Sequence, residues 1–466
     1  MPKTFVIRTF GCQMNEHDSE RLAGMLVADG MRQTDDMGEA DVVVLNTCCI
    51  RENADQKLYG TLGSLKALVD AKPGLQIAVG GCLAQKDREL IQQKVGWVDV
   101  VFGTHNLTSA PGLLRRAASE GPVMEILNAP TPESISNHLV APDAIRELPY
   151  TAWVTIQMGC DNSCAFCIVP AVRGPEVSRP LRDIVAEVEG LARRGVTEVT
   201  LLGQNVNSYG RDITRRRPLF ADLLRQVGAV EGIGRIRFTS PHPKDLRPET
   251  IEAMASVPEV CEQLHLPLQS GSNRVLSAMR RGYTAERYLE RLAAARAAID
   301  DLGVTTDVIV GFPGETQKDF EDTLAVVAEA SYDSAYTFIF SPRPGTRAAD
   351  MHDAFIAPEV IAERFDRLKA VVDRASLSRH QDRVGRTEEV LVEGVSRRDE
   401  GMLSGRTRQG KLVHFAPTAP GRRGTPTAGS LARVAITAGH PHHLSGRLEE
   451  VTARPRHRVR IPVAGA

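Results

Sequence analysis

The stretch GCDNSCAFC, residues 159–167, places three cysteines at Cys-x3-Cys-x2-Cys spacing. It follows the apolar, β-branched run AWVTIQM, residues 152–158, which predicts a strand. We therefore expect Cys160, Cys164 and Cys167 on the loop that leaves the end of this strand, where reactive groups are usually displayed. Thiolates suit iron–sulfur clusters and zinc, and a cluster usually takes four cysteines. With three ligands in the run, one iron of a 4Fe–4S cluster would have no protein ligand.

Two other interpretations of this cysteine run are weaker. A structural zinc site needs a fourth Cys or His nearby, and none follows closely in the sequence. Three unligated core cysteines would have this spacing only by coincidence. The run resembles the signature of the radical S-adenosylmethionine (radical SAM) superfamily, in which the methionine part of SAM chelates the iron that lacks a protein ligand.

The bulk composition is that of an ordinary globular protein. The chain has 466 residues, which suggests about three domains, with 42% hydrophobic and 25% charged residues. Its net charge of −1 identifies no partner. The N-terminus runs directly into a strand pattern without a signal-peptide layout, and no apolar run reaches transmembrane length. We therefore expect a cytoplasmic protein without membrane contact, whose eight cysteines serve metal binding or catalysis rather than disulfides.

The first part of the chain, residues 1–118, predicts an α/β domain. Buried-type strand patterns alternate with helical patterns, which favours a parallel sheet covered on both faces. The strand patterns cover residues 5–10, 41–47, 75–80 and 100–103, and the helical patterns cover residues 16–30 and 51–71 and begin again at about residue 84.

One cysteine follows each of the first three strands of this domain, namely Cys12, Cys48 and Cys82. Because the carboxyl ends of parallel strands share one edge of a sheet, we expect these cysteines to converge. Each also precedes a helix, whose N-terminal field favours the thiolate. They predict a second metal site with three protein ligands, in preference to three independent buried cysteines. Cys49 adjoins Cys48 but points away from it in a turn or strand, so we interpret it as a bystander.

The middle of the chain predicts an incomplete barrel. Residues 119–148 are polar and interrupted by prolines, so we expect a linker there. Residues 149–378 then carry six strand-like runs with helical patterns between them, each run ending in polar or glycine-rich residues. Repeated strand–helix units predict a barrel with its active face at the carboxyl ends of the strands. Six units rather than eight predict a (β/α)6 barrel that is open at one side, accessible to a macromolecular substrate.

Several residues at these strand ends are candidates for contact with SAM or substrate. They are Arg173, Gln204, Asn205, Ser240, His242, Gln269, Gly311 and Gly314. Arg173 lies six residues after the last cysteine of the run and carries the charge needed to face a SAM carboxylate or an RNA phosphate.

Plainer interpretations remain open for some of these candidates. A tight turn at Pro313 explains the two glycines nearly as well as contact with a ligand does. A hydrogen-bonded structural histidine is at least as good an interpretation for His242, and equally for His265. Cys261 lies at the edge of an apolar strand pattern and is expected in the core.

The last part of the chain changes to short β-type runs separated by glycine-rich turns, which predicts a small β-barrel over residues 379–450 and a basic tail over residues 451–466. Residues 381–466 hold 15 Lys and Arg against 8 Asp and Glu, a net charge of +7, while the rest of the chain carries −8. A basic β-module beside a catalytic domain predicts RNA binding. The candidate contacts are Arg406, Arg408 and Lys411. For the tail, a solvated end is an equally good interpretation.

Over nearly its whole length the chain resembles the methylthiotransferase family of radical SAM enzymes. The stretches that carry the resemblance are TFGCQMN at 9–15, NTC at 46–48, GGCLAQ at 80–85, the Cys160 loop with Arg173-Gly174, and GFPGET at 311–316. The branch of the family that acts on tRNA is the most similar. Its matching stretches are IRENA at 50–54, VSRP at 177–180, SPHP at 240–243, and the residues from Tyr336 to Thr346. Cys49 departs from the pattern, and the doubt it raises is an exchange of ligand with Cys48.

The resemblance implies a fold, two cofactors and a reaction. The implied fold is an α/β chain with an N-terminal parallel-sheet domain, a partial radical SAM barrel and a C-terminal TRAM β-barrel. The run at 160–167 would hold a 4Fe–4S cluster that binds SAM and reduces it to methionine and a 5′-deoxyadenosyl radical. That radical would take hydrogen from carbon 2 of N6-(dimethylallyl)adenosine at position 37 of tRNA. Cys12, Cys48 and Cys82 would hold an auxiliary 4Fe–4S cluster carrying the sulfur, which a second SAM methylates. The implied partners are the tRNA anticodon stem-loop and an electron donor of the flavodoxin or ferredoxin type, and we expect a monomer.

The sequence leaves three alternative functions open. A methylthiotransferase acting on threonylcarbamoyladenosine in tRNA is close to the first. One acting on an aspartate of a ribosomal small-subunit protein is disfavoured, because a basic ribosomal protein would be repelled by the basic C-terminal segment. A non-catalytic RNA-binding protein with structural zinc would be colourless, whereas iron–sulfur clusters would make the protein brown.

Overall fold

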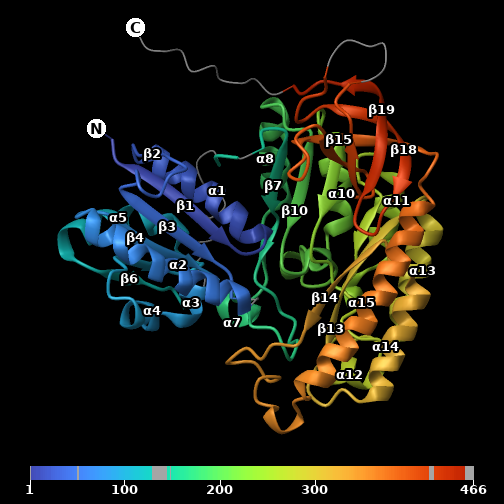
Figure 1. Ribbon diagram of the computed structural model, residues 1–466, viewed down its shortest axis with the longest axis horizontal. Helices are drawn as coiled ribbons and strands as arrows, with labels where there is room; N and C mark the ends of the chain where they lie inside the picture. Colours follow the sequence, from blue (N-terminus) through green and yellow to red (C-terminus); the bar gives the residue numbers. More distant parts are fainter. Residues whose placement is uncertain (1, 50–51, 129–143, 147, 419–424, 457–466) are drawn as a thin grey trace.

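The computed structural model describes residues 2–49, 52–128, 144–146, 148–418 and 425–456 (Figure 1). Its first part is a six-stranded parallel sheet in the order β2-β1-β3-β4-β5-β6. These strands are β1 (Thr4–Phe10), β2 (Arg32–Gln33), β3 (Val42–Thr47), β4 (Gln76–Gly81), β5 (Val100–Phe102) and β6 (Val123–Glu125). The four predicted strands are the inner ones, and the two short edge strands were not predicted. Because β6 belongs to the sheet, the sheet extends into the stretch expected to be a linker, whose residues 129–143 and 147 lie outside the described residues.

Helices cover both faces of this sheet, as the alternating pattern predicts. They are α1 (Gln13–Ala28), α2 (Glu52–Ala71), α3 (Cys82–Asp87), α4 (Glu89–Lys94) and α5 (Ala110–Glu120). Successive residues of β3 point to opposite sides, so Val43 and Leu45 enter one buried cluster while Val42 and Val44 enter the other. Burial on both faces explains why these strands read as continuous apolar runs.

The middle of the chain forms an open barrel from two three-stranded parallel sheets, β11-β10-β7 and β12-β13-β14. A bridge between Ile236 and Val260 joins them, which leaves β7 and β14 at the two ends of the series. The strands are β7 (Thr151–Thr155), β10 (Glu198–Leu202), β11 (Arg235–Phe238), β12 (Gln263–His265), β13 (Gly303–Val310) and β14 (Ser334–Ile339). All six coincide with predicted strand runs, and the pair β8 (Gln157–Met158) and β9 (Val177–Ser178) forms a small antiparallel ribbon beside them.

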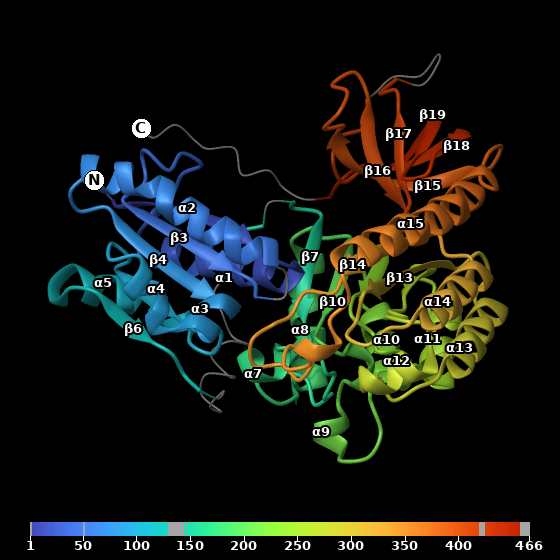
Figure 2. The same ribbon diagram turned by 60° about the horizontal axis from the view of Figure 1, so that its bottom comes forward.

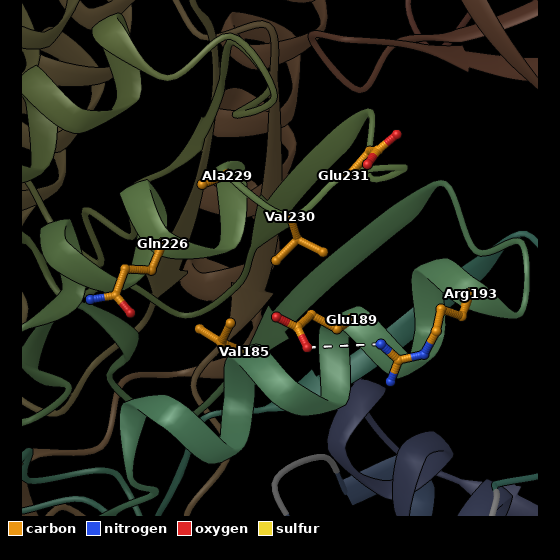
Figure 3. Close-up of a pocket in the computed structure, with 7 residues that line it drawn as sticks. All are labelled: Val185, Glu189, Arg193, Gln226, Ala229, Val230 and Glu231. Atoms are coloured by element: carbon orange, nitrogen blue, oxygen red, sulfur yellow. Dashed lines mark ion pairs between the residues drawn. The ribbon is translucent and has the colours of Figure 1, made fainter.

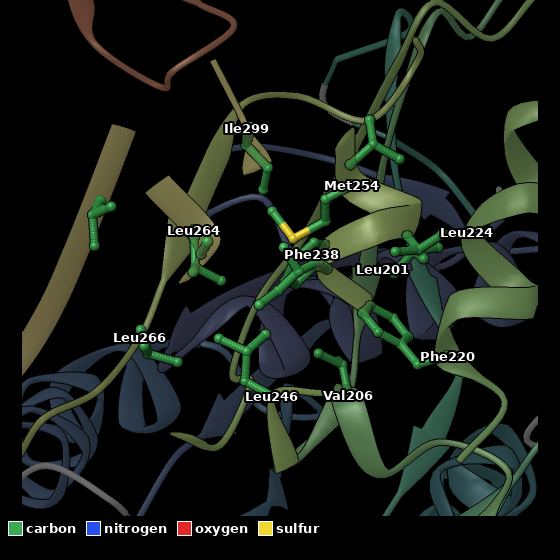
Figure 4. Packing of buried hydrophobic residues seen from close by; sticks show 14 of the residues in the cluster. Leu201, Val206, Phe220, Leu224, Phe238, Leu246, Met254, Leu264, Leu266 and Ile299 are labelled. Atoms are coloured by element: carbon green, nitrogen blue, oxygen red, sulfur yellow. The ribbon is translucent and has the colours of Figure 1, made fainter. Parts of the chain in front are cut away.

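The barrel core lies between the strands and the surrounding helices. Leu201, Phe238 and Leu264 of the strands pack with Phe220 and Met254 of the helices, and all five are buried (Figure 4). The helices of this part are α7 (Val169–Arg173), α8 (Leu181–Arg193), α9 (Arg211–Thr214), α10 (Phe220–Gly228), α11 (Pro248–Ser256), α12 (Asn273–Ala278), α13 (Ala285–Ala298), α14 (Gln317–Ala330) and α15 (Pro358–Gln381). Five of these helices, α7, α9, α11, α12 and α15, were not predicted from the sequence.

Five strands after α15 close into a small barrel in the order β15-β16-β17-β19-β18. They are β15 (Thr387–Val395), β16 (Leu403–Thr407), β17 (Leu412–Phe415), β18 (Leu431–Gly439) and β19 (Leu444–Ala453). The predicted small β-barrel is therefore confirmed. Of the basic tail, residues 457–466 lie outside the described residues.

The small β-barrel docks on the amino ends of the large barrel's strands, away from the cysteine loop (Figure 2). Arg235, the first residue of β11, donates from Nη1 to the carbonyl of Arg406 at 3.0 Å. At the start of β13, a Cβ added to Gly303 would lie 2.9 Å from the Gln409 side chain. The two barrels are thus packed too closely to leave their shared surface free for RNA.

Two of the residues predicted to contact RNA, Arg408 and Lys411, lie in the interface between the two barrels. Arg408 binds Glu262 through Nε at 2.8 Å and is partly buried, and Lys411 binds Asp333 at 2.5 Å and is almost fully buried. Both side chains therefore hold the two barrels together instead of facing solvent. Arg406 stays half exposed beside Glu393.

Removing the Lys411 ammonium should destabilise this interface. Burial opposes ionisation of Asp333, but the Lys411 charge and hydrogen bond outweigh it, so the pKa of Asp333 lies below its usual value. In Lys411→Ala a buried carboxylate loses its counter-charge, which typically costs about 3–5 kcal/mol. Thermal denaturation should show the loss, and Lys411→Met combined with Asp333→Asn should recover most of it. An unchanged melting temperature in Lys411→Ala would contradict this role. Because the Asp333 pKa is depressed, the contribution is present above the ordinary carboxyl pKa and is lost as the pH falls below it.

Candidate functional site

The cysteine run leaves the barrel as a loop that is tied down on several sides. Cys160 donates its N–H to the carbonyl of Gly174 at 3.2 Å, and Ala165 donates its N–H to the carbonyl of Met279 at 3.0 Å. Gly159 has a φ of +78°, and a Cβ there would lie 1.9 Å from the carbonyl oxygen of Pro175. Only glycine fits this close approach, so the residue before the first cysteine is required by the backbone.

The three thiols of this loop lie close enough to influence one another. Burial raises the pKa of Cys160 and of Cys167, the latter to about 12, and the neighbouring cysteines add to both shifts. Arg281 donates from Nη1 to the Sγ of Cys164 at 3.2 Å and from Nε to the hydroxyl of Tyr283. Sequence reasoning missed Arg281, because 117 residues separate it from Cys164 and no local spacing connects them.

Six polar side chains of the large barrel carry buried atoms with no partner among the described residues. They are Oε1 of Gln157, Gln204 and Gln269, Oδ1 of Asn205, Oε1 of Glu176 and Nε2 of His242. Four of these six residues, all except Gln157 and Glu176, were predicted site residues. An unpartnered buried polar atom is costly, so such a set is suited to a polar ligand rich in donors and acceptors. SAM, with its amino acid and adenosine groups, fits this set.

The side chains of His242 and Glu176 have opposite pKa shifts. Burial, with Arg281, Lys244 and Arg291 nearby, lowers the pKa of His242 to about 2, so its ring is neutral. Its Nδ1 accepts from the Lys244 N–H at 3.1 Å, which leaves the proton on the unpartnered Nε2. Burial raises the pKa of Glu176 to about 7. The set of unpartnered atoms therefore includes an uncharged hydrogen-bond donor on His242 and an oxygen of a carboxyl group, Glu176, whose pKa lies near neutrality.

Four of the predicted site residues have a positive φ, but for different reasons. Ser240 and Gln269 have φ values of +60° and +68°, a strained state for non-glycine residues that often marks functional sites. Ser240 is exposed and Gln269 is buried. Gly311 and Gly314 both have a φ of +77°, and Glu315 accepts the Gly311 N–H at 3.0 Å. The turn interpretation therefore accounts for the two glycines.

Cys12, Cys48 and Cys82 lie at the carboxyl ends of β1, β3 and β4, and their thiols interact. A hydrogen bond with Cys48 lowers the pKa of Cys12 to about 6. A hydrogen bond with Cys49 lowers the pKa of Cys82 to about 7, and the Arg173 charge contributes. The thiol of Cys49, interpreted as a bystander to the metal site, is buried, and its hydrogen bond with Cys82 and its burial raise its pKa.

Two asparagines that the sequence analysis did not single out hold this second group together. Asn15 donates from Nδ2 to Oδ1 of Asn46 and to the carbonyl of Thr47, both at 3.2 Å. Asn46 donates back to the carbonyl of Asn15 at 2.8 Å. These bonds join the first turn of α1 to the end of β3, and so bring the first two cysteines to one place. Their closeness in sequence to Cys12 and Cys48 was the only sign in the sequence that could have pointed to them.

Arg173 does not lie where it was predicted. It donates from Nε to the Sγ of Cys82 at 3.3 Å and from Nη2 to Asp18 at 2.9 Å, so its side chain belongs to the N-terminal cysteine group. The next residue, Gly174, binds the backbone of Cys160. The two cysteine groups therefore meet across the interface between the domains, one on each side of the Arg173–Gly174 peptide.

Among the described residues, no three His, Cys, Asp or Glu side chains are arranged to hold a single metal ion. A surface groove of about 520 Å³ lies between α8 and α10, lined by Val185, Glu189, Arg193, Gln226, Ala229, Val230 and Glu231 (Figure 3). The groove includes none of the predicted site residues. Within the described part of the chain, no helix is long and apolar enough to cross a membrane.

Three family models match successive parts of the chain. Residues 4–103 match the uncharacterized protein family UPF0004, residues 154–327 the radical SAM superfamily, and residues 381–448 the TRAM domain. The tRNA-2-methylthio-N6-dimethylallyladenosine synthase of Nocardia farcinica is 52% identical over 95% of this chain and 88% of its own length. The chain belongs to the tRNA-2-methylthio-N6-dimethylallyladenosine synthase family.

A second relative supports the same family, and a solved structure supports the fold. The synthase of Saccharopolyspora erythraea is 51% identical over 98% of this chain and 92% of its own length. The radical S-adenosylmethionine methyltransferase TsrM from Kitasatospora setae aligns with a TM-score of 0.54 over 75% of this chain and 77% of its own. At 13% identity that likeness concerns the fold alone. Family and fold together make this chain a radical SAM methylthiotransferase.

Proposed function

We propose that this enzyme adds a methylthio group to carbon 2 of N6-(dimethylallyl)adenosine at position 37 of tRNA. The observation that carries the proposal is the meeting of two three-cysteine groups on either side of the Arg173–Gly174 peptide. Hydrogen removal and sulfur delivery on one carbon need two centres that the same base can reach. The family relatives carry this activity in their names.

Cys160, Cys164 and Cys167 would hold the 4Fe–4S cluster that a radical SAM enzyme uses. When bound, this cluster supplies the electron that cleaves SAM. The unpartnered atoms of Gln157, Asn205 and His242 would orient SAM beside the loop.

Cys12, Cys48 and Cys82 would hold an auxiliary 4Fe–4S cluster. The support is chemical: two of these thiols have a lowered pKa, and thiolates are the form that binds iron. Three protein ligands would again leave one iron open, the place where sulfur would be carried for methylation by a second SAM.

The tRNA anticodon stem-loop would contact both ends of the large barrel. Exposed arginines of the TRAM barrel are available for phosphates, namely Arg397, Arg398, Arg406, Arg433 and Arg447. The strands between this barrel and the cysteine loop are up to eight residues long, so the RNA would extend over roughly 25 Å along the open side. We further propose a cytoplasmic monomer that takes electrons from a flavodoxin- or ferredoxin-like donor.

Mass spectrometry of tRNA nucleosides from cells with and without the gene tests the substrate. We expect the 2-methylthio-dimethylallyl nucleoside to disappear and its unthiolated precursor to accumulate. Loss of the methylthio form of threonylcarbamoyladenosine would instead point to that nucleoside. An unchanged nucleoside profile would contradict the proposal, and the ribosomal small-subunit protein would then be weighed for a missing methylthio group.

A further inference from the structure

Arg173 belongs to the large barrel in sequence and to the N-terminal cysteine group in space. It is the last residue of α7, whose Val172 packs in the core of the N-terminal domain. Its side chain is 3% exposed and reaches Cys82 Sγ at 3.3 Å and Asp18 at 2.9 Å. A third nitrogen, Nη1, is buried and has no partner among the described residues. The radical SAM domain thus contributes a buried cation to a site built by another domain.

We propose that Arg173 is a positioning residue that raises the reduction potential of the auxiliary cluster. The inference rests on the proposed cluster at Cys12, Cys48 and Cys82 and goes beyond it by naming what tunes that cluster. Hydrogen bonds to ligating sulfurs, net charge and burial are the protein's means of setting cluster potentials. Arg173 supplies a hydrogen bond to a ligating sulfur and a positive charge, and its side chain is buried. Reduction adds one negative charge, which a fixed guanidinium stabilises.

The surroundings of Arg173 suit this role. A guanidinium keeps its charge at every physiological pH, so the effect does not depend on titration. Burial limits screening by solvent and salt, and so preserves the interaction with a sulfur at this distance. Asp18 fixes the orientation of the side chain and partly offsets its charge. Nη1 retains a donor that can serve a second sulfur of the bound cluster.

A parallel arrangement at the other cysteine group provides a matched control. Arg281 is also buried and donates to one cysteine sulfur, that of Cys164, at 3.2 Å. Each group therefore has one arginine on one of its thiols. If each arginine acts on its own group, loss of Arg281 should leave the auxiliary cluster unchanged.

The test uses the full chain with Cys160, Cys164 and Cys167 replaced by alanine, so that iron binds at the N-terminal group alone. This protein and its variants are reconstituted anaerobically with iron and sulfide, and the potential is measured by redox titration with electron paramagnetic resonance. We expect Arg173→Gln to lower the equilibrium constant for reduction about tenfold, or about 59 mV for a one-electron couple. Arg173→Lys should shift it less, Asp18→Asn should raise the potential, and Arg281→Gln should not change it.

The opposite signs expected for Arg173→Gln and Asp18→Asn separate a charge effect from damage to the site. Shifts of the same sign in both, or no shift in Arg173→Gln, would overturn the proposal while leaving the cluster in place. If the parent protein takes up no iron at all, the auxiliary cluster itself is wrong, and this inference fails with it.

Discussion

Cys164→Ala should abolish both 5′-deoxyadenosine formation and methylthiolation while leaving the chain folded. Cys164 is the central thiol of the group proposed to hold the SAM-cleaving cluster, and Arg281 donates to its sulfur. Without it the loop keeps two thiols, too few to hold a 4Fe–4S cluster with one open iron. Iron should fall from about eight to about four atoms per chain, because the N-terminal group is unaffected. Anaerobic iron analysis and chromatography of the SAM products measure both effects.

Cys261→Ala is the matched control for this variant. Cys261 is buried in the barrel, and burial raises its pKa, as expected for an unligated core thiol. Its replacement should preserve the iron content and the formation of 5′-deoxyadenosine. Cleavage of SAM at the normal rate by Cys164→Ala would refute the assignment of Cys160, Cys164 and Cys167.

Cys48→Ala should separate the two half-reactions. The N-terminal group would lose its cluster, and iron should again fall from about eight to about four atoms per chain. Because this change leaves the three barrel cysteines intact, reductive cleavage of SAM should continue and 5′-deoxyadenosine should form without any methylthiolated product. The measurement is the amount of 5′-deoxyadenosine and of modified nucleoside formed by the same sample. We expect 5′-deoxyadenosine to form while the modified nucleoside stays undetectable.

Cys49→Ala tests whether the neighbouring thiol can replace Cys48. The main interaction of the Cys49 thiol is with Cys82, whereas the Cys12 thiol interacts with Cys48, so we expect normal iron content and product formation. A loss of iron in Cys49→Ala together with normal iron in Cys48→Ala would show that Cys49 is the ligand. Loss of SAM cleavage in Cys48→Ala would show that the two groups do not act separately.

The elements that the sequence predicted well are those defined by local pattern. The six barrel strands and the four inner strands of the N-terminal sheet were predicted because buried strands leave a continuous apolar run. The short edge strands β2 and β6 were missed, because both residues of β2 are exposed and polar and β6 lies in the proline-interrupted stretch that predicts a linker. The interval between Cys160, Cys164 and Cys167 is itself local, so the sequence alone determined that these thiols share a loop.

Side-chain partners far apart in the chain were decided by the tertiary structure alone. Arg173 follows the cysteine run closely, yet α7 packs against the N-terminal domain and turns the guanidinium to Cys82, 91 residues away. Lys411 belongs to a basic segment that predicts RNA contact, but the docking of the small β-barrel on the large barrel buries its side chain against Asp333. Periodicity and spacing report which residues share an element, whereas charge partners depend on how elements pack. The sequence by itself thus determined two cysteine groups and three domains, and only packing decided which arginine serves which group.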